Sequence, residues 1–404
     1  MARVDSLPEP AKAVLQRGSA IEREFGFDLI SRVSGLSQQE LLSHLSALKD
    51  AELIYERGIY PRSTYIFRHA LTREVVYNSI LAARKKKLHL DIGDAIEEIY
   101  KDSPDEHYEA LAAHYITGEQ YEKGAEYCRL AARKGEKAAS LNDAIVYGEK
   151  RVSCLERLPR SRDVEKQIID TRATLGLYYA QMNHFVKAKE AIEPVVELAL
   201  KRDHKRRLAQ IYTIMGGYSY AIDEDFPKAF EYLEESLKLG EESNDMVSLV
   251  LSSSWMGGAR ANNCDFDQAL TNWERTLEFN LATNNLPGMA ATKSIMARWL
   301  YSIQGKCDLA YDTSNEALRL AEESGDTLSK ALGHTSQGVA FYFKGFLDEA
   351  EPHLLKGSDF CDRINFLTWG SPANLHLGEL YFDKGEYQKC QDLCGKTISL
   401  MEGR

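Results

Sequence analysis

The chain has 404 residues, a length typical of two or more domains or of one extended array. Hydrophobic residues make up 44% of it and no apolar run approaches the roughly 20 residues that span a bilayer, which excludes a membrane-spanning protein. The net charge is -11, and the acidic excess lies wholly in residues 105–404, which argues against nucleic-acid binding by that part. Seven Cys and an N-terminus without a secretory signal favour a cytoplasmic protein with reduced thiols.

Residues 1–104 predict three helices and a hairpin, the order of a winged helix, followed by a connecting helix. The helices are expected at residues 8–22, 27–33 and 38–49. Ser37 is expected to cap the third helix. Short apolar runs at 53–56 and 65–68 predict the two strands of the hairpin. The third helix has one Lys and no Arg, so it offers few donors to DNA.

Residues 105–404 are dominated by a repeat of 40 or 41 residues. One column of the repeat is Ala188, Ala229, Ala269, Ala310 and Ala350, and Cys390 continues it. A second column lies twelve residues earlier and is small in five of six copies: Gly176, Gly217, Gly257, Arg298, Gly338 and Gly378. Two columns rich in aromatic residues keep the same phase. The pattern predicts two antiparallel helices per repeat, which cross closely where both carry a small residue.

Turn and N-cap residues recur between the copies, at 201–203, 243–245, 283–285 and 324–326. An earlier copy begins near Leu111, and a less regular helical pair is expected between Ala125 and Leu158. These observations predict a domain of seven or eight helix pairs over residues 105–404, preceded by the domain at residues 1–104.

The order small-x-x-aromatic, then Gly-x-aromatic-x-x-Ala, resembles the tetratricopeptide repeat. It is clearest at Gly378 to Tyr381 and at Gly385 to Cys390, where Cys takes the Ala position. The period is longer than the usual ~34 residues and is similar to the longer-helix variety of bacterial signalling proteins. The resemblance covers about three quarters of the chain, and it implies an all-α, right-handed solenoid.

Residues 65–77 together with 84–89 resemble the end of the ATPase core of STAND-type signalling ATPases, in which a winged helix precedes a repeat array. The resemblance is greatest to bacterial proteins that carry an N-terminal class III adenylate/guanylate cyclase domain. The chain contains no G-x-x-x-x-G-K-[ST] loop. The resemblance therefore implies a non-catalytic regulatory and protein-interaction region of a longer parent, with neither cofactor nor metal.

The same resemblance suggests His69 and Arg84 as contacts to a nucleotide-binding domain. For His69 the alternative is helix capping, or packing between the hairpin and the next helix. For Arg84, which begins the run Arg84-Lys85-Lys86-Lys87, the alternative is a solvated helix face. Cys390 and Cys394 lie one helical turn apart, but both fall on apolar repeat columns, so we expect packing there and no metal site.

The candidate partner site is the inner face of the solenoid. Positions one, four and five residues after the small column supply its side chains, namely Tyr218, Ile222, Asn262, Trp299, Ile303, Tyr342 and Phe343. Aromatic residues with a nearby Asn suit a protein or peptide partner. The alternative is a tightly curled superhelix that buries these side chains. Basic residues able to clamp a peptide carboxylate are missing from these positions.

Two other functions stay open at this stage. One is the sensor region of an ATP-dependent transcription regulator, in which the winged helix or another domain binds DNA. The other is a stand-alone repeat scaffold, which the completeness of the repeats suggests.

Overall fold

The computed structural model describes residues 4, 6–138, 140–364 and 367–402 and confirms an all-α repeat solenoid. The chain divides into two compact units, Met1–Arg172 and Ala173–Arg404. The predicted domain boundary at residue 104 follows the change in sequence pattern, and it stays a prediction. Among the described helices, none is long and apolar enough to cross a membrane.

The first unit opens with three helices and a small antiparallel sheet. The helices are α2 (Glu9–Ile21), α3 (Phe27–Ser34) and α4 (Gln38–Asp50), and the strands are β1 (Glu24–Gly26), β2 (Ile54–Arg57) and β3 (Thr64–Phe67). The strand order is β1-β3-β2, with Phe25 opposite Tyr65 and Tyr55 opposite Ile66. The three helices and the β2–β3 hairpin were predicted. Strand β1 was not, because three residues carry too little alternation to be recognised without their partner strand.

Local chemistry explains where α4 begins. Ser37 and Glu40 form a reciprocal capping box, in which the Ser37 backbone N–H donates to Glu40 Oε2 at 3.0 Å and the Glu40 N–H donates to Ser37 Oγ. The predicted N-cap is therefore confirmed. Leu41, Leu45 and Leu48 follow on one face and are buried in the core of the three helices and the sheet.

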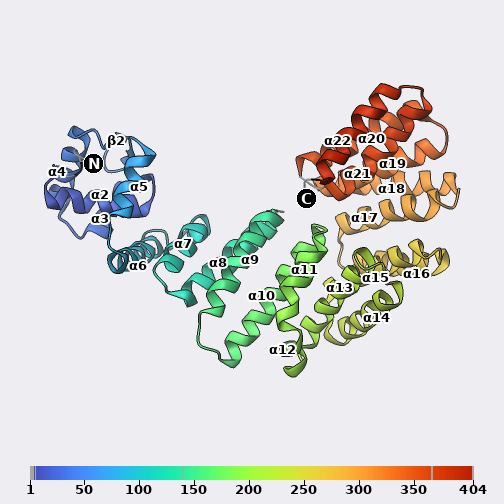
Figure 1. The fold of residues 1–404 in the computed structure, drawn as a ribbon, viewed down its shortest axis with the longest axis horizontal. Coiled ribbons are helices and arrows are strands. Elements are labelled where there is room, and N and C mark those ends of the chain that lie inside the picture. The colour runs from blue at the N-terminus through green and yellow to red at the C-terminus, as the bar shows by residue number, and fades with distance from the viewer. Residues whose placement is uncertain (1–3, 5, 139, 365–366, 403–404) are drawn as a thin grey trace. The chain divides into compact units, whose positions relative to one another are not determined.

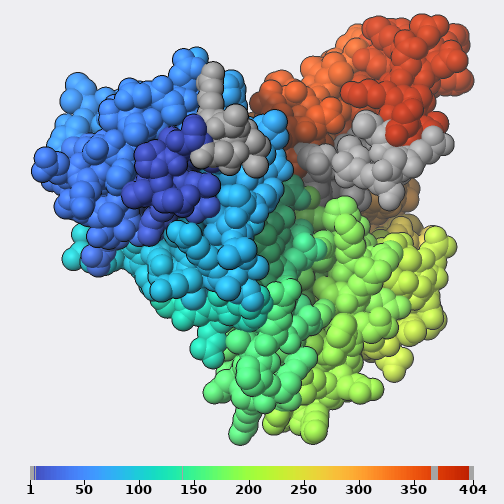
Figure 2. Space-filling model, turned by 60° about the vertical axis from the view of Figure 1, so that its left-hand side comes forward, coloured from blue at the N-terminus to red at the C-terminus, as the bar shows by residue number. Residues whose placement is uncertain are grey.

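The rest of the first unit is helical. Its elements are α5 (Ala70–Asn78), α6 (Ala82–Ile99), η1 (Pro104–His107), α7 (Tyr108–Thr117), α8 (Tyr121–Lys137) and α9 (Leu141–Glu156). A second core joins Leu29 of α3 to Ile92 of α6 and Leu111 of α7, so the first repeat packs directly on the N-terminal helices. In the view of Figure 2, part of the N-terminal segment of this unit, in the darkest blue, lies on its surface.

The second unit is a run of helix pairs, which Figure 1 shows from green to red, and the boundary between residues 172 and 173 lies within its first helix, α10. The pairs are α10 (Arg162–Gln181) with α11 (Phe185–Ile192), η2 (Glu193–Val195) and α12 (Val196–Lys201); α13 (Lys205–Ala221) with α14 (Phe226–Ser243); α15 (Met246–Asn262) with α16 (Phe266–Ala282); α17 (Leu286–Met296) and η3 (Ala297–Ser302) with α18 (Cys307–Ser324); α19 (Thr327–Phe343) with α20 (Leu347–Arg363); and α21 (Leu367–Asp383) with α22 (Tyr387–Glu402). Together with α7 and α8, the described residues hold seven pairs and the additional helix α9, which packs on α8. The further irregular pair expected between Ala125 and Leu158 is one additional helix, α9, because α8 is already the second helix of the copy that begins near Leu111.

The small columns lie where the helices of a pair cross. The five Ala of the first column are completely buried. A Cβ atom on Gly257 would lie 2.7 Å from Trp273 Nε1, and one on Gly338 would lie 2.7 Å from Leu354 Cγ, so these positions exclude larger residues. In α13 the close approach to α14 belongs to Gly216, whereas Gly217 faces Trp255. The second copy of the small column is thus one residue earlier than predicted.

The fourth copy, where Arg298 stands in the small column, contains the π-helical segment η3. A π-turn adds one residue to a helix. Ala297 lies 40 residues after Gly257 and is completely buried, so it is the small residue in phase with the preceding copy. Because the π-turn adds one residue, the turn residue Gly305 lies 41 residues after Cys264, the corresponding residue of the preceding copy. The small position of this copy is therefore occupied by Ala297, and Arg298 is the residue next to it.

The turn inside each helix pair places one residue in the left-handed region. This residue is Asn183, Glu224, Cys264, Gly305, Gly345 and Gly385 in successive pairs, with φ between 53° and 82°. The predicted turns between pairs also carry such a residue, at Asp203, Asn244, Asn284 and Gly325. The carboxylates or amides that follow three of these turns, on Asp245, Asn285 and Asp326, accept hydrogen bonds from the next helix N-terminus, which confirms them as N-caps.

Candidate functional site

The first helix of each pair lies on the inner side of the stack. Helix α13 packs on α15, α17 on α19, and α19 on α21. Close packing between successive first helices gives the solenoid its concave face, on which such proteins offer an extended binding surface.

One predicted column lines this face with exposed side chains. Ile222, Ile303 and Phe343 are 46%, 55% and 43% exposed, and Asn262 is also exposed. These residues end the first helices of four successive pairs. For this column the alternative of complete burial is wrong. Tyr218, Trp299 and Tyr342 are half-buried.

Three of the predicted residues contact neighbouring elements within the solenoid. Asn262 Nδ2 donates to Tyr220 Oη at 2.7 Å, and Tyr342 Oη donates to Asp383 Oδ2 at 2.8 Å, so each contact joins one repeat to the next. The Lys189 ammonium lies 4.0 Å from the centre of the Tyr218 ring. Burial, together with the Asp383 carboxylate, raises the pKa of Tyr342 to about 12.

Arg298 is a charged residue of the inner helices that the sequence analysis did not select. It lies on η3, its residue is 8% exposed, and its guanidinium lies 4.7 Å from the centre of the Trp299 ring. Burial lowers the pKa of Arg298 to about 10, and the Glu379 carboxylate opposes this shift. A buried guanidinium is costly to desolvate and marks functional positions more often than an exposed one does.

The Arg298 charge acts on two side chains of α21, His376 and Glu379. On α21, His376 Nδ1 lies 2.8 Å from Glu379 Oε2. The His376 ring lies 6.2 Å from the rings of both Tyr342 and Phe343 of α19. Burial first and the Arg298 charge second lower the pKa of His376, while Glu379 acts in the opposite direction. His376 therefore lies beside Glu379 of its own helix and close to two aromatic rings of α19, the preceding inner helix.

Of these residues, Tyr342, Phe343 and Trp299 were predicted, and Arg298, His376 and Glu379 were not. The sequence carried one signal for the rest, because an Arg stood in a column of small residues. His376 and Glu379 had no such signal, since their relation to Arg298 arises only when the repeats stack.

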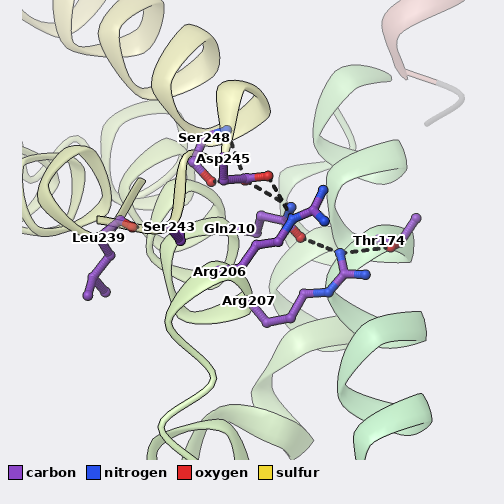
Figure 3. A network of polar contacts seen from close by, with 8 residues as sticks. All are labelled: Thr174, Arg206, Arg207, Gln210, Leu239, Ser243, Asp245 and Ser248. Carbon is purple, nitrogen blue, oxygen red and sulfur yellow. Dashed lines mark hydrogen bonds and ion pairs between the residues drawn. The ribbon is translucent and has the colours of Figure 1, made fainter. Parts of the chain in front are cut away.

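A second polar network stabilises the inner helices at the N-terminal end of this unit (Figure 3). Asp245 Oδ2 accepts hydrogen bonds from Ser248 Oγ at 2.7 Å and from Gln210 Nε2 at 2.9 Å, while its Oδ1 lies 2.9 Å from Arg206 Nε. Arg207 continues the network to Gln210 at 2.6 Å and to Thr174 on α10 at 3.3 Å. Burial acts to raise the pKa of Asp245, but these donors outweigh it and lower the pKa. The network therefore connects three successive inner helices.

In the first unit, the two residues proposed to contact a nucleotide domain are both exposed. His69 occupies the N-cap position of α5, but its side chain makes no capping hydrogen bond, so the capping alternative is wrong. Arg84 lies in the first turn of α6. In the basic run that follows, Lys86 pairs with Glu119 at 2.7 Å and Lys85 lies over the Tyr77 ring.

A buried histidine pair lies behind that basic run. His89 Nδ1 and His114 Nδ1 are 2.8 Å apart and share a hydrogen bond, and His89 Nε2 lies 2.9 Å from Tyr77 Oη. Burial is the main cause that lowers the pKa of His89 to about 4 and that of His114 to about 3. Both imidazoles are therefore neutral near pH 7, and the pair connects α6 to α7.

Cys390 and Cys394, which were both expected to pack in the core, differ in their exposure. Cys390 is half-buried and Cys394 is exposed, so the expectation of core packing is wrong for Cys394. In the parts of the chain that the structure describes, no three His, Cys, Asp or Glu side chains are grouped so that they could hold a metal ion.

Comparisons with known proteins point to repeat proteins. A family model described as anaphase-promoting complex subunit 5 matches residues 220–259 and 258–336. No curated protein is similar to the chain in sequence. Among solved structures, a STAND protein with a tetratricopeptide repeat sensor from Pyrococcus horikoshii is similar over 99% of this chain, with a TM-score of 0.54 and 16% identity. The chain spans 58% of the length of that protein.

Two Rap proteins are similar at comparable levels. A Rap protein complexed with Competence and Sporulation Factor has a TM-score of 0.59 and 11% identity, covering 98% of this chain and 99% of its own. The Rap conjugation gene regulator of plasmid pLS20, solved with the Phr* peptide, has a TM-score of 0.58 and 13% identity, covering 80% and 92%. At such low identity the similarity establishes a tetratricopeptide-like fold and leaves function to the site itself.

Proposed function

We propose that the chain is a non-catalytic, regulatory region whose solenoid binds a protein or peptide partner along its inner face. The observation that carries this proposal is the exposed apolar column formed by Ile222, Ile303 and Phe343 at the ends of three of four successive inner helices, with Asn262 at the fourth. Apolar side chains left exposed in a regular row are costly in water and mark an interaction surface. The fold is shared with a Rap protein solved with a peptide, which supports a peptide as the partner.

We propose further that the parent protein is a signalling ATPase of the STAND class, with an adenylate/guanylate cyclase domain as the more specific form. The order of three helices and three strands in residues 9–67 supports a winged helix. The STAND protein that shares the fold is longer than this chain, which leaves room for a nucleotide-binding domain. His69 and Arg84 are exposed and so are accessible to such a domain.

The DNA-binding alternative has less support. Lys49, the basic residue of α4, pairs with Glu56 of β2 at 2.5 Å. A recognition helix whose Lys is already paired offers little to the phosphate backbone. We therefore retain the peptide-binding region as the function that the site supports best.

The proposal is tested by selecting a random peptide library displayed on phage against the full chain. The test variant replaces the exposed column, as Ile222→Ser, Ile303→Ser and Phe343→Ser. The matched control replaces three exposed leucines of second helices, as Leu281→Ser, Leu309→Ser and Leu355→Ser. Because all six side chains are at least 43% exposed, both variants should fold, which circular dichroism verifies.

We expect peptides selected on the wild type to bind the control variant with unchanged affinity and to lose at least tenfold on the test variant, about 1.4 kcal/mol. Equal affinity for all three proteins, or no selectable peptide, would refute an inner-face binding site.

The regulatory part of the proposal requires a joined parent protein. Its nucleotide turnover is compared with and without residues 105–404, and with His69→Ala and Arg84→Ala. We expect turnover to change when the solenoid is removed and when either side chain is replaced. Identical turnover in every case would contradict a regulatory role.

A further inference from the structure

We propose that the helix pair α21–α22 carries a self-association surface, through which two copies of this chain pack against each other around a twofold axis. Exposed side chains of both helices form this surface, which we call the α21–α22 face; they are Leu375, Phe382, Tyr387, Cys394 and Ile398. The inference goes beyond the proposed function and does not depend on a peptide partner. The occupant is a second copy of the chain.

The second helices show that the equivalent surface is covered in the other pairs. One column lies seven positions after the start of each second helix. In the five preceding pairs of this unit its residues are at most 1% exposed, and they are Ile192, Leu233, Trp273, Ser314 and Leu354. The equivalent residue of α22, Cys394, is exposed. Four positions later, Leu237 of α14 is 7% exposed, whereas Ile398 of α22 is 56% exposed.

The starts of the second helices differ in the same way. The first residue of each is half-buried in the five preceding pairs, for example Phe266 and Leu347. Tyr387, the first residue of α22, is 63% exposed. In the preceding pairs the first helix of the next pair supplies the cover, since α14 packs on α15, α18 on α19 and α20 on α21. The α21–α22 face therefore continues the interface that joins the pairs.

The first helices give an independent comparison. Thr335 of α19 is buried and Tyr342 is half-buried, because α21 packs on that side of α19. Their equivalents in α21, Leu375 and Phe382, are 56% and 60% exposed. The Phe382 and Tyr387 rings lie 5.5 Å apart between centres, so the two helices contribute to one continuous surface.

Such a surface is costly in water. The outer face at an end of a repeat array is ordinarily polar, because no further repeat covers it. On α22, by contrast, Tyr387, Cys394 and Ile398 follow one another at spacings of seven and four residues, which places them on one side of the helix. A contiguous apolar patch of this kind marks an interaction surface.

The charges that join the other pairs are missing from this face. Lys344 Nζ lies 2.7 Å from Asp308 Oδ1, and Lys384 Nζ lies 2.8 Å from Asp348 Oδ1. In each case the Asp is the second residue of a second helix and the Lys belongs to the next pair. The equivalent residue of α22 is Gln388, which carries no charge. A further pair of the same kind would therefore find no carboxylate for its Lys.

The hydroxyl that joins α19 to α21 is missing as well. Tyr342 Oη donates to Asp383 of the next pair, and the equivalent residue of α21 is Phe382. In a twofold contact the same patch of each copy meets, so side chains near the axis lie opposite themselves. Like charges would repel there, whereas apolar side chains are buried on both sides at once. An apolar face that lacks the charged links of the other pairs is therefore suited to a second copy.

The test is sedimentation velocity of the full chain over a wide range of protein concentrations, in which we expect a reversible dimer. The test variant is Phe382→Ser with Ile398→Ser. The matched control is Leu281→Ser with Leu355→Ser, which removes two exposed apolar side chains from other second helices. All four side chains are at least 45% exposed, so both variants should fold, which circular dichroism verifies. The test variant should dimerise at least tenfold more weakly, and the control should dimerise like the wild type.

Cysteine cross-linking locates the contact. Cys264 and Cys394 are both exposed, and Cys394 belongs to the α21–α22 face whereas Cys264 lies in a turn within another pair. A short bis-maleimide should give covalent dimers of the wild type and of Cys264→Ser. Cys394→Ser should lose them, because its thiol lies near its own copy in the dimer.

Three results would overturn the inference. The first is a monomer at every concentration, which would leave the face to a helix of another protein. The second is equal dimerisation of the test and control variants, or a dimer that does not cross-link through Cys394. The third is growth into larger assemblies as the concentration rises, which would indicate a head-to-tail contact instead of a twofold one.

Discussion

Replacing Asp245 by Ala tests whether long-range polar contacts stabilise the stacking of the inner helices. The Asp245 side chain is 1% exposed, and it caps α15 while accepting hydrogen bonds from Gln210 and Arg206 of α13. Loss of an N-cap costs about 1 kcal/mol. Leaving the buried Gln210 amide unsatisfied costs a further 1–3 kcal/mol or so. Arg206 is 58% exposed, so its ion pair adds little.

The expected loss of unfolding free energy is therefore about 2–4 kcal/mol for Asp245→Ala. The matched control is Asp225→Ala, because Asp225 caps α14 through Lys228 N at 3.1 Å from an exposed position without the buried partners. It should cost only about 1 kcal/mol. Urea unfolding followed by circular dichroism gives the two losses, and hydrogen exchange shows whether α13 and α15 open first, as a repeat array permits.

The pH dependence gives an independent check. Because the folded state lowers the pKa of Asp245, its ionisation contributes stability above the unfolded value of 3.8, and this stability is lost as pH falls through the folded pKa. Asp245→Asn should therefore lose less stability than the wild type on acidification. Equal losses for Asp245→Ala and Asp225→Ala, with no change in the acid response, would refute the reasoning.

Three other predictions concern packing, charge and capping. Gly338→Ala should destabilise the solenoid by about 1–3 kcal/mol, because the added Cβ would meet Leu354. Gly395→Ala should instead stabilise α22 by up to about 1 kcal/mol, because the added Cβ would have no neighbour within 4 Å. Thermal unfolding of the two variants measures both effects. Between pH 7.5 and 5.5 the unfolding free energy of the first unit should fall by about 1.4 kcal/mol for each histidine of the buried pair, because each can protonate only after unfolding. His89→Gln should reduce this fall by the contribution of one histidine. Urea titrations at the two pH values measure the difference. Ser37→Ala should cost the first unit about 1 kcal/mol in the same titration, and no change would show that the capping box contributes nothing.

The sequence determined the repeat architecture because its signals are local. A small residue is needed wherever two helices of one pair cross, and a left-handed residue is needed in each turn, so both recur in every copy. The exposed column of Ile222, Ile303 and Phe343 was predictable for the same reason, since helical phase alone places it on the inner face. The capping box at Ser37 is more local still, because its two partners are three residues apart.

Only the tertiary structure decided the features that depend on partners distant in sequence. Strand β1 has three residues, and it is a strand because β3 pairs with it. The π-turn η3 shifted the phase of one copy, so the sequence placed Arg298 in the small column instead of beside it. Asp245 accepts hydrogen bonds from Arg206 and Gln210, more than 30 residues away, and the Glu379 charge acts on Arg298 from two repeats further on. The periodicity specifies that helices stack, whereas the match of charges between stacked helices depends on side-chain positions that the periodicity does not encode.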